Sequence, residues 1–120
     1  MTAPNIAGLT TVTGKSVGVA VGTSVSDLVA NAASSNKVFK INSVVVSNVD
    51  GSNAATVVVI LQKAGSNNFH LAKDISVPAD TTLVVVSKDM QIYLEENDKI
   101  RVSASAASDL EAICSYEEIS

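Results

Sequence analysis

Hydrophobic and β-branched residues form two runs between Lys37 and Lys63, on either side of a polar break at residues 47–53. The runs read KVFKINSVVV and ATVVVILQK, and the break reads SNVDGSN. Val and Ile lose little rotamer freedom on a pleated strand, so both runs predict strands. Asp50-Gly51 favours a tight turn between them, because Gly accepts positive φ at low cost. The pattern therefore predicts a central β-hairpin over Lys37–Lys63.

Both arms of this predicted hairpin are apolar on both faces. Simple alternation puts Phe39, Ile41 and Val45 on one face and Val44 and Val46 on the other. A strand with two apolar faces lies at the centre of a domain or is covered by another chain. We therefore expect the hairpin at the centre of the domain, with room for a subunit interface.

Shorter runs with turn signals between them predict further strands. In residues 99–104 the alternation places Ile100, Val102 and Ala104 inward. Pro78 supplies turn chemistry between two of the runs, because its ring presets φ. The remaining strands are expected at residues 11–21, 69–73, 81–87, 91–94 and 110–116.

Two stretches are ambiguous. Gly14, Gly18 and Gly22 are four residues apart, as in packed membrane helices, but that motif needs about twenty apolar residues. Lys15 and the neighbouring valines contradict it, so these glycines are predicted at bulges or turns. Residues 23–33 fit a short helix capped by a serine or a strand, and the β-rich surroundings favour the strand.

The predicted fold is all-β, with eight or nine short antiparallel strands in a β-sandwich or jelly-roll-like barrel. The strands occupy one domain over residues 11–120. Residues 1–10 carry no charge and include Pro4 and Gly8, which predicts an extended N-terminal arm. The arm is either a loose terminus or a segment that docks on a neighbouring subunit.

Composition and charge narrow the function. The chain of 120 residues has two Phe, two Tyr and no Trp, so its core lacks large rings and we expect partners or further copies to add stability. A net charge of −4 argues against nucleic acid as a partner. No apolar run reaches the roughly 18 residues of a membrane span, and MTAPNIAGL lacks the features of a signal peptide.

Charge is also unevenly placed. Only Lys15 and Asp27 are charged before Lys37, so the first third of the chain suits burial in an interface. The single cysteine, Cys114, cannot form an internal disulfide, which indicates a reducing compartment.

Catalytic chemistry finds little support. Nucleophilic catalysis needs a base beside the nucleophile, and the only histidine is His70. A pairing of His70 with Cys114 is possible in space, but a lone cysteine in a strand is usually a small core residue. We therefore expect no enzyme, no catalytic residues and no cofactor.

The evidence for a metal site is equally weak. Asn48, Asp50 and Ser52 are spaced as at the start of a calcium loop, but the sixth and twelfth positions hold Asn53 and Val59 instead of Gly and Glu. A turn explains these residues better, and no metal is expected.

An acidic cluster and two tyrosines complete the candidates. Glu95, Glu96 and Asp98 are either paired carboxylates, a weak cation site or a hydrated turn, and the hydrated turn is preferred. Glycan binding would depend on stacking against Tyr93 or Tyr116, since there is no Trp.

The segments KINSVVVSNVDGSNAATVVV, ISVPADTTL and SASAASDLEA resemble small virion structural proteins of tailed bacteriophages, especially cyanobacterial and other marine phages. The resemblance covers residues 37–119. It implies a non-enzymatic, repeated component of the virion, assembled in the host cytoplasm.

Within that class, the leading hypothesis is a capsid decoration (cement) protein, a homo-oligomer with a trimer favoured, bound to the major capsid protein or to other virion proteins. The alternatives are a tail-, baseplate- or fibre-associated domain and a receptor- or glycan-binding module.

Overall fold

The computed structural model describes residues 8, 11–64 and 66–120. Apart from Gly8, the predicted arm at residues 1–10 lies outside the described residues, so its role stays a prediction. The described residues form nine strands: β1 (Val12–Val21), β2 (Ser26–Ala30), β3 (Val38–Asn48), β4 (Ala55–Lys63), β5 (Asn67–Val77), β6 (Thr82–Val86), β7 (Ile92–Leu94), β8 (Lys99–Ala104) and β9 (Leu110–Ile119).

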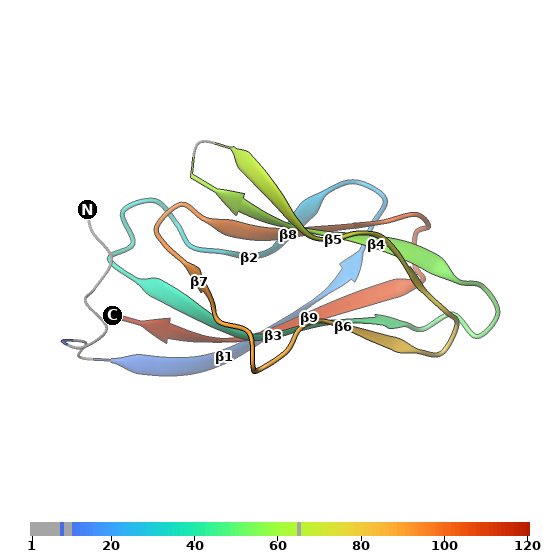
Figure 1. Ribbon diagram of the computed structural model, residues 1–120, viewed down its shortest axis with the longest axis horizontal. Coiled ribbons are helices and arrows are strands. Elements are labelled where there is room, and N and C mark those ends of the chain that lie inside the picture. Colours follow the sequence, from blue (N-terminus) through green and yellow to red (C-terminus); the bar gives the residue numbers. More distant parts are fainter. Residues whose placement is uncertain (1–7, 9–10, 65) are drawn as a thin grey trace.

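The strands form two sheets that pack face to face (Figure 1). Sheet A has the order β1-β9-β3-β6, and β7 also pairs with β3. Sheet B has the order β2-β8-β4-β5. Every pairing is antiparallel, and most connections cross from one sheet to the other. This wrapping is the jelly-roll form of a β-sandwich, and the predicted fold class is confirmed.

The predicted central hairpin is wrong. β3 pairs with β9, β6 and β7 in sheet A, whereas β4 pairs with β8 and β5 in sheet B. The two arms therefore lie in different sheets, and the segment between them is an arch across the sandwich. Each arm is flanked by strands on both sides, so each lies centrally within its own sheet.

Asparagine and aspartate side chains build this arch, and Gly51 does not adopt the positive φ of a tight hairpin turn. The Asn48 Oδ1 accepts a hydrogen bond of 2.9 Å from the Asp50 N–H, and the Asp50 Oδ1 accepts one of 2.8 Å from the Ser52 N–H. The buried Asn48 Nδ2 donates to the carbonyl of Val77 in sheet B. The polar break thus connects the two sheets and does not turn the chain back within a single sheet.

Strand β3 does not alternate over its whole length. Its register with β9 shifts between Ile41 and Ser43, which adds one residue at this point. The bulge brings Ile41, Val44 and Val46 to the same side, where all three are fully buried. Simple alternation, which grouped Ile41 with Val45, was therefore wrong beyond residue 42.

The glycines of β1 were also predicted incorrectly. Gly14 and Gly18 lie inside the strand, whose register with β9 runs without a shift over Val12–Val21. Gly22 follows the strand. Two of the three glycines therefore occupy regular strand positions, although glycine weakens a strand interior.

Other strand predictions are confirmed. Residues 26–30 form β2, so the strand interpretation of residues 23–33 was correct and the short helix was not. In β8, Ile100 and Val102 are fully buried and Ala104 nearly so. The largest fully buried side chains, Ile41, Leu94, Ile100 and Leu110, lie between the sheets among many valines.

Candidate interaction surface

His70 and Cys114 do not form a catalytic pair. Cys114 is fully buried on the inner side of β9 in sheet A, and burial raises the pKa of its thiol to about 12. His70 is exposed on β5 in sheet B. A thiol with this pKa stays protonated at neutral pH and is a poor nucleophile. Cys114 is the small core residue that the sequence predicted.

The acidic cluster at residues 95–98 is built into the fold. Asp98 is 1% exposed, and its carboxylate accepts hydrogen bonds from the Ala64 N–H at 3.0 Å and the Glu95 N–H at 2.9 Å. The Lys63 ammonium donates to the same carboxylate at 2.6 Å and to Glu95 at 3.0 Å. The hydrated-turn interpretation was therefore wrong for Asp98, which ties the β7–β8 loop to the end of β4.

The opposite end of the sandwich brings two carboxyl groups together. The pKa of Asp109 is raised, first by partial loss of water and then by the charge of Asp50. The pKa of Asp50 is lowered, chiefly because its carboxylate accepts a hydrogen bond from the Ser52 N–H. Among the described residues, no group of three His, Cys, Asp or Glu side chains is arranged to hold a metal ion. Asp50 is therefore a turn-forming residue in this structure.

The two tyrosines are both partly buried. Tyr116 stacks on Phe39, with ring centroids 5.0 Å apart, and packs against the core. Tyr93 lies half-buried on β7 beside Lys40. A sugar ring needs an open aromatic face. Because Phe39 covers one face of its ring, Tyr116 lacks the free stacking platform on which a glycan site would depend.

The outer faces of the two sheets differ in character. On sheet B, Arg101 and Lys99 from β8 form ion pairs of 2.9 and 3.8 Å with Asp27 from β2. Charged groups that keep their water are costly to bury against a partner. The outer face of sheet B is therefore the more solvated of the two.

The outer face of sheet A carries a row of apolar and small residues. The strand registers place Gly18, Ile113, Val45 and Val84 side by side on β1, β9, β3 and β6. Ile113 is 47% exposed and Val84 57% exposed. We call these four residues the apolar row. Its existence depends on four segments that are distant in the sequence.

Hydroxyl side chains border the apolar row. Ser115 pairs with Ser16 and Ser43 on one side. On the other side, Ser47 and Thr82 have their hydroxyl oxygens 3.0 Å apart, and Glu111 is the nearby charge. This centre of the face therefore has an uncharged row with a mainly hydroxyl border, which resembles the apolar core and polar rim of protein interfaces.

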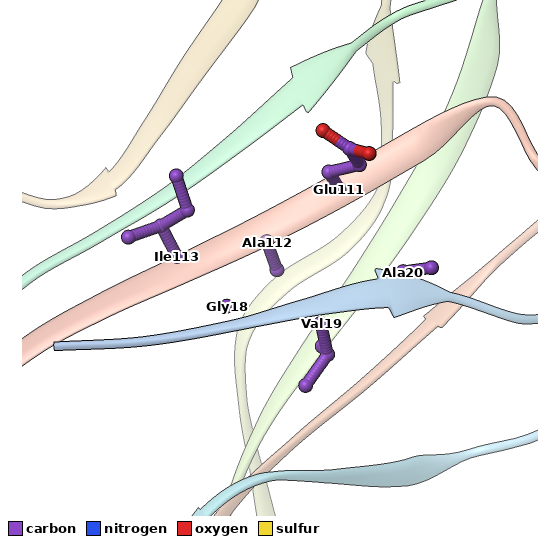
Figure 2. A pocket seen from close by; sticks show the side chains of 6 residues that line it. All are labelled: Gly18, Val19, Ala20, Glu111, Ala112 and Ile113. Carbon is purple, nitrogen blue, oxygen red and sulfur yellow. The ribbon is translucent and has the colours of Figure 1, made fainter.

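A shallow, open depression of about 280 Å³ lies over β1 and β9 at one end of the apolar row. Figure 2 shows the side chains of Glu111 and Ile113 on one side of β9 and that of Ala112 on the other. Gly18 has no side chain to fill the space beside Ile113. Small-molecule sites are usually enclosed and occupy roughly 300–1,000 Å³. An open hollow of this size fits a contact between proteins better than a ligand site.

Ion pairs strengthen the end of the sandwich where β1 begins. Glu118 accepts from the Lys37 ammonium at 2.6 Å and from the Lys15 ammonium at 3.0 Å. These two cations, Lys37 first, lower the pKa of Glu118 against the opposing effect of its partial burial. The pKa of Lys15 is raised by the same contact. Lys15, the only charge on β1, is thus compensated within the chain.

Comparison with known proteins gives the fold class and no family. No family model matches the chain, and no curated protein matches it. The solved structures that are similar in fold include the following two. A subunit of Bacillus endospore appendages, described as disulfide-linked pili, aligns at 13% identity and a TM-score of 0.52, covering 90% of this chain and 87% of the other.

The second structure is the acid-stable capsid of Helicobacter pylori bacteriophage KHP30. It aligns at 10% identity and a TM-score of 0.52, covering 93% of this chain and 90% of the other. At such low identity the likeness establishes the shared fold alone. The resemblance to cyanobacterial and marine phages, seen in the sequence, is not supported by these comparisons. The part of the chain that the structure describes contains no helix long and apolar enough to cross a membrane.

Proposed function

We propose that this protein is a non-enzymatic structural subunit of a phage particle, assembled in the host cytoplasm, and that it decorates the capsid by binding the major capsid protein. The fold likeness to a phage capsid protein supports the class. The observation that carries the proposal is the exposed apolar row on the outer face of sheet A. A surface of this kind becomes stable when a partner covers it.

Decoration works through many modest contacts repeated by symmetry, so the strength of one contact matters less than its number. The apolar row and its hydroxyl border offer such a contact without burying an ion pair. Homo-oligomers add a further level of repetition. A trimer, expected from the family resemblance, is one closed form and a two-fold dimer is another.

Capsids assembled without this protein provide the test. Val84→Lys or Ile113→Lys should weaken binding to them at least about tenfold, because each places a charge in the apolar contact. Ile75→Lys is the matched control, since Ile75 is also exposed, at 41%, but lies on β5 in sheet B. Equal losses for all three variants would refute the role of the outer face of sheet A.

The N-terminal arm is tested separately. Deletion of residues 1–10 should weaken attachment to bare capsids without lowering the melting temperature of the domain. If the truncated protein saturates bare capsids as well as the full chain does, the arm has no role in attachment.

A second candidate is a repeated position in a tail or fibre, because the same fold occurs in a pilus subunit. Labelled antibody against this chain, viewed on whole particles by electron microscopy, separates the two positions. Label on the head supports decoration, and label confined to the tail supports the second candidate.

A further inference from the structure

Sheet edges offer unpaired peptide groups to other chains, and three of the four edges in the described structure carry protection against this. β2 has five residues and a register shift between Asp27 and Val29. β5 has two register shifts, and Asp74 in it has a φ of 52°. β6 and β7 are short strands of five and three residues. A foreign strand finds no long, regular template on these edges.

The fourth edge, β1, lacks such protection. It is ten residues long and pairs with β9 in one unbroken register over Val12–Val21. It contains no proline, and its one charged residue, Lys15, is already paired with Glu118 at 3.0 Å. In the described chain no strand pairs with its other side. β1 is therefore a long, regular edge that remains open.

The hydrogen-bond pattern shows which peptide groups face this open side. Thr11 and Ser120 exchange two backbone hydrogen bonds of 2.9 Å at the start of the β1–β9 ladder. Bonded and non-bonded pairs alternate along an antiparallel ladder, so the odd-numbered residues of β1 bond to β9. The N–H and C=O groups of the even-numbered residues, among them Ser16, Gly18 and Ala20, therefore point away from the sheet.

We propose that β1 pairs antiparallel with β1 of a second copy of this chain, about a two-fold axis at Gly18. The pairing joins the two A sheets edge to edge into one continuous sheet. The N–H and C=O groups of the even-numbered residues in both β1 strands form the hydrogen bonds between the two copies. This contact does not depend on the role of the protein in a particle.

Side-chain direction limits the possible registers. Opposite residues of an antiparallel pair point to the same face, so outward residues of one β1 must face outward residues of the other. A centre at Gly18 meets this condition, with Ser16 opposite the partner's Ala20. It also aligns the two apolar rows, which meet end to end at the two Gly18 residues.

The inner face and the charges favour the same centre. Val17 and Val19 are half-buried at the margin of the core. In this register Val17 of one copy lies opposite Val19 of the second copy, and Val19 lies opposite Val17. The two Lys15 side chains are then about 20 Å apart along the strands. A centre at Ser16 would bring them to within two positions of each other, where like charges repel.

Disulfide trapping tests the pairing directly. A hydrogen-bonded antiparallel pair has its Cα atoms about 5.5 Å apart, within the range of a disulfide. Gly18→Cys places a thiol at the axis, and a Cβ there is 3.7 Å from the Ile113 Cγ1, an ordinary contact. Purified Gly18→Cys should therefore form a covalent dimer under mild oxidation. The buried Cys114 does not compete.

Gly14→Cys is the matched control, because a Cβ at Gly14 lies in open space and its counterpart on the partner would be about 27 Å away. Rapid cross-linking of Gly18→Cys and not of Gly14→Cys supports the proposal. Equal cross-linking of the two variants, or none, overturns it.

Sedimentation of the chain without a cysteine substitution gives an independent measure. We expect a dimer that Gly18→Lys and Gly18→Glu each weaken about tenfold, since like charges then face each other at the axis. Mixing the two variants should restore the dimer. A wild-type monomer at about 1 mM, or a trimer unaffected by either substitution, overturns the pairing. The capsid-binding proposal is tested independently with Val84→Lys, so failure of the dimer does not count against it.

Discussion

Asp98 offers the most informative test of what holds this small, valine-rich domain together. Three donors converge on its buried carboxylate: the Lys63 ammonium at 2.6 Å, the Ala64 N–H at 3.0 Å and the Glu95 N–H at 2.9 Å. Asp98→Asn keeps the shape but replaces one oxygen with an NH₂ group, which faces a donor. The substitution removes a charge-assisted bond and leaves a buried group unsatisfied, at a cost of about 3 kcal/mol.

This cost should be visible in both urea and thermal unfolding. Circular dichroism follows the sheets, and for 120 residues about 3 kcal/mol corresponds to a fall in melting temperature of roughly 12 °C. Glu95→Gln is the internal control, because Glu95 contacts the same Lys63 ammonium but its side chain is 70% exposed. An exposed pair contributes about 0–1 kcal/mol. Equal losses for Asp98→Asn and Glu95→Gln would refute the reasoning.

The pH dependence of stability provides a second test of the contact between Lys63 and Asp98. The hydrogen bond from Lys63 to Asp98 is the main cause that raises the pKa of Lys63, against the opposing effect of its burial. A raised folded-state pKa stabilises the fold fully below the unfolded-state value of about 10.4, and the contribution fades as the pH rises through the folded-state value. The destabilising effect of Asp98→Asn should therefore shrink in strongly alkaline solution.

Two further outcomes are expected. Because Lys37 and Lys15 lower the pKa of Glu118, this residue stabilises the fold above its unfolded-state pKa and loses that effect as the pH falls through its folded-state pKa. The free energy of unfolding of Glu118→Gln, measured by denaturant titration at several pH values, should therefore fall less steeply at acidic pH than that of the unchanged chain. An equally steep fall would contradict this. Cys114 should react with a thiol reagent at pH 8 only in denaturant, because burial raises the pKa of its thiol to about 12. Fast labelling of the folded chain would show that this part of the core opens readily.

The surface proposed here could be found only in part from the sequence. Val84 and Ile113 are apolar residues within the predicted strands at residues 81–87 and 110–116, but no local pattern groups them. Their alignment depends on the pairing of β9 with both β1 and β3, and of β3 with β6. The open edge was equally hidden, since an edge strand is defined by the partner it lacks.

Asp98 illustrates a different kind of failure. Within its own turn it has acidic neighbours and looks hydrated, as Glu95 is. Its burial follows from Lys63 and Ala64, which approach from the end of β4, more than thirty residues away. No local pattern distinguishes these two acids.

The sequence by itself determined where the strands lie, because alternation and β-branched residues act over a few neighbours. It correctly placed the inward residues of β8, a strand within residues 23–33 and the all-β class. Only the tertiary structure decided which strands pair. Asp50-Gly51 suits a hairpin and an arch equally well, and the choice depends on β9 and β8, which occupy the positions beside β3 and β4. Strand pairing is a long-range property, and in a jelly roll almost every partner is distant along the chain.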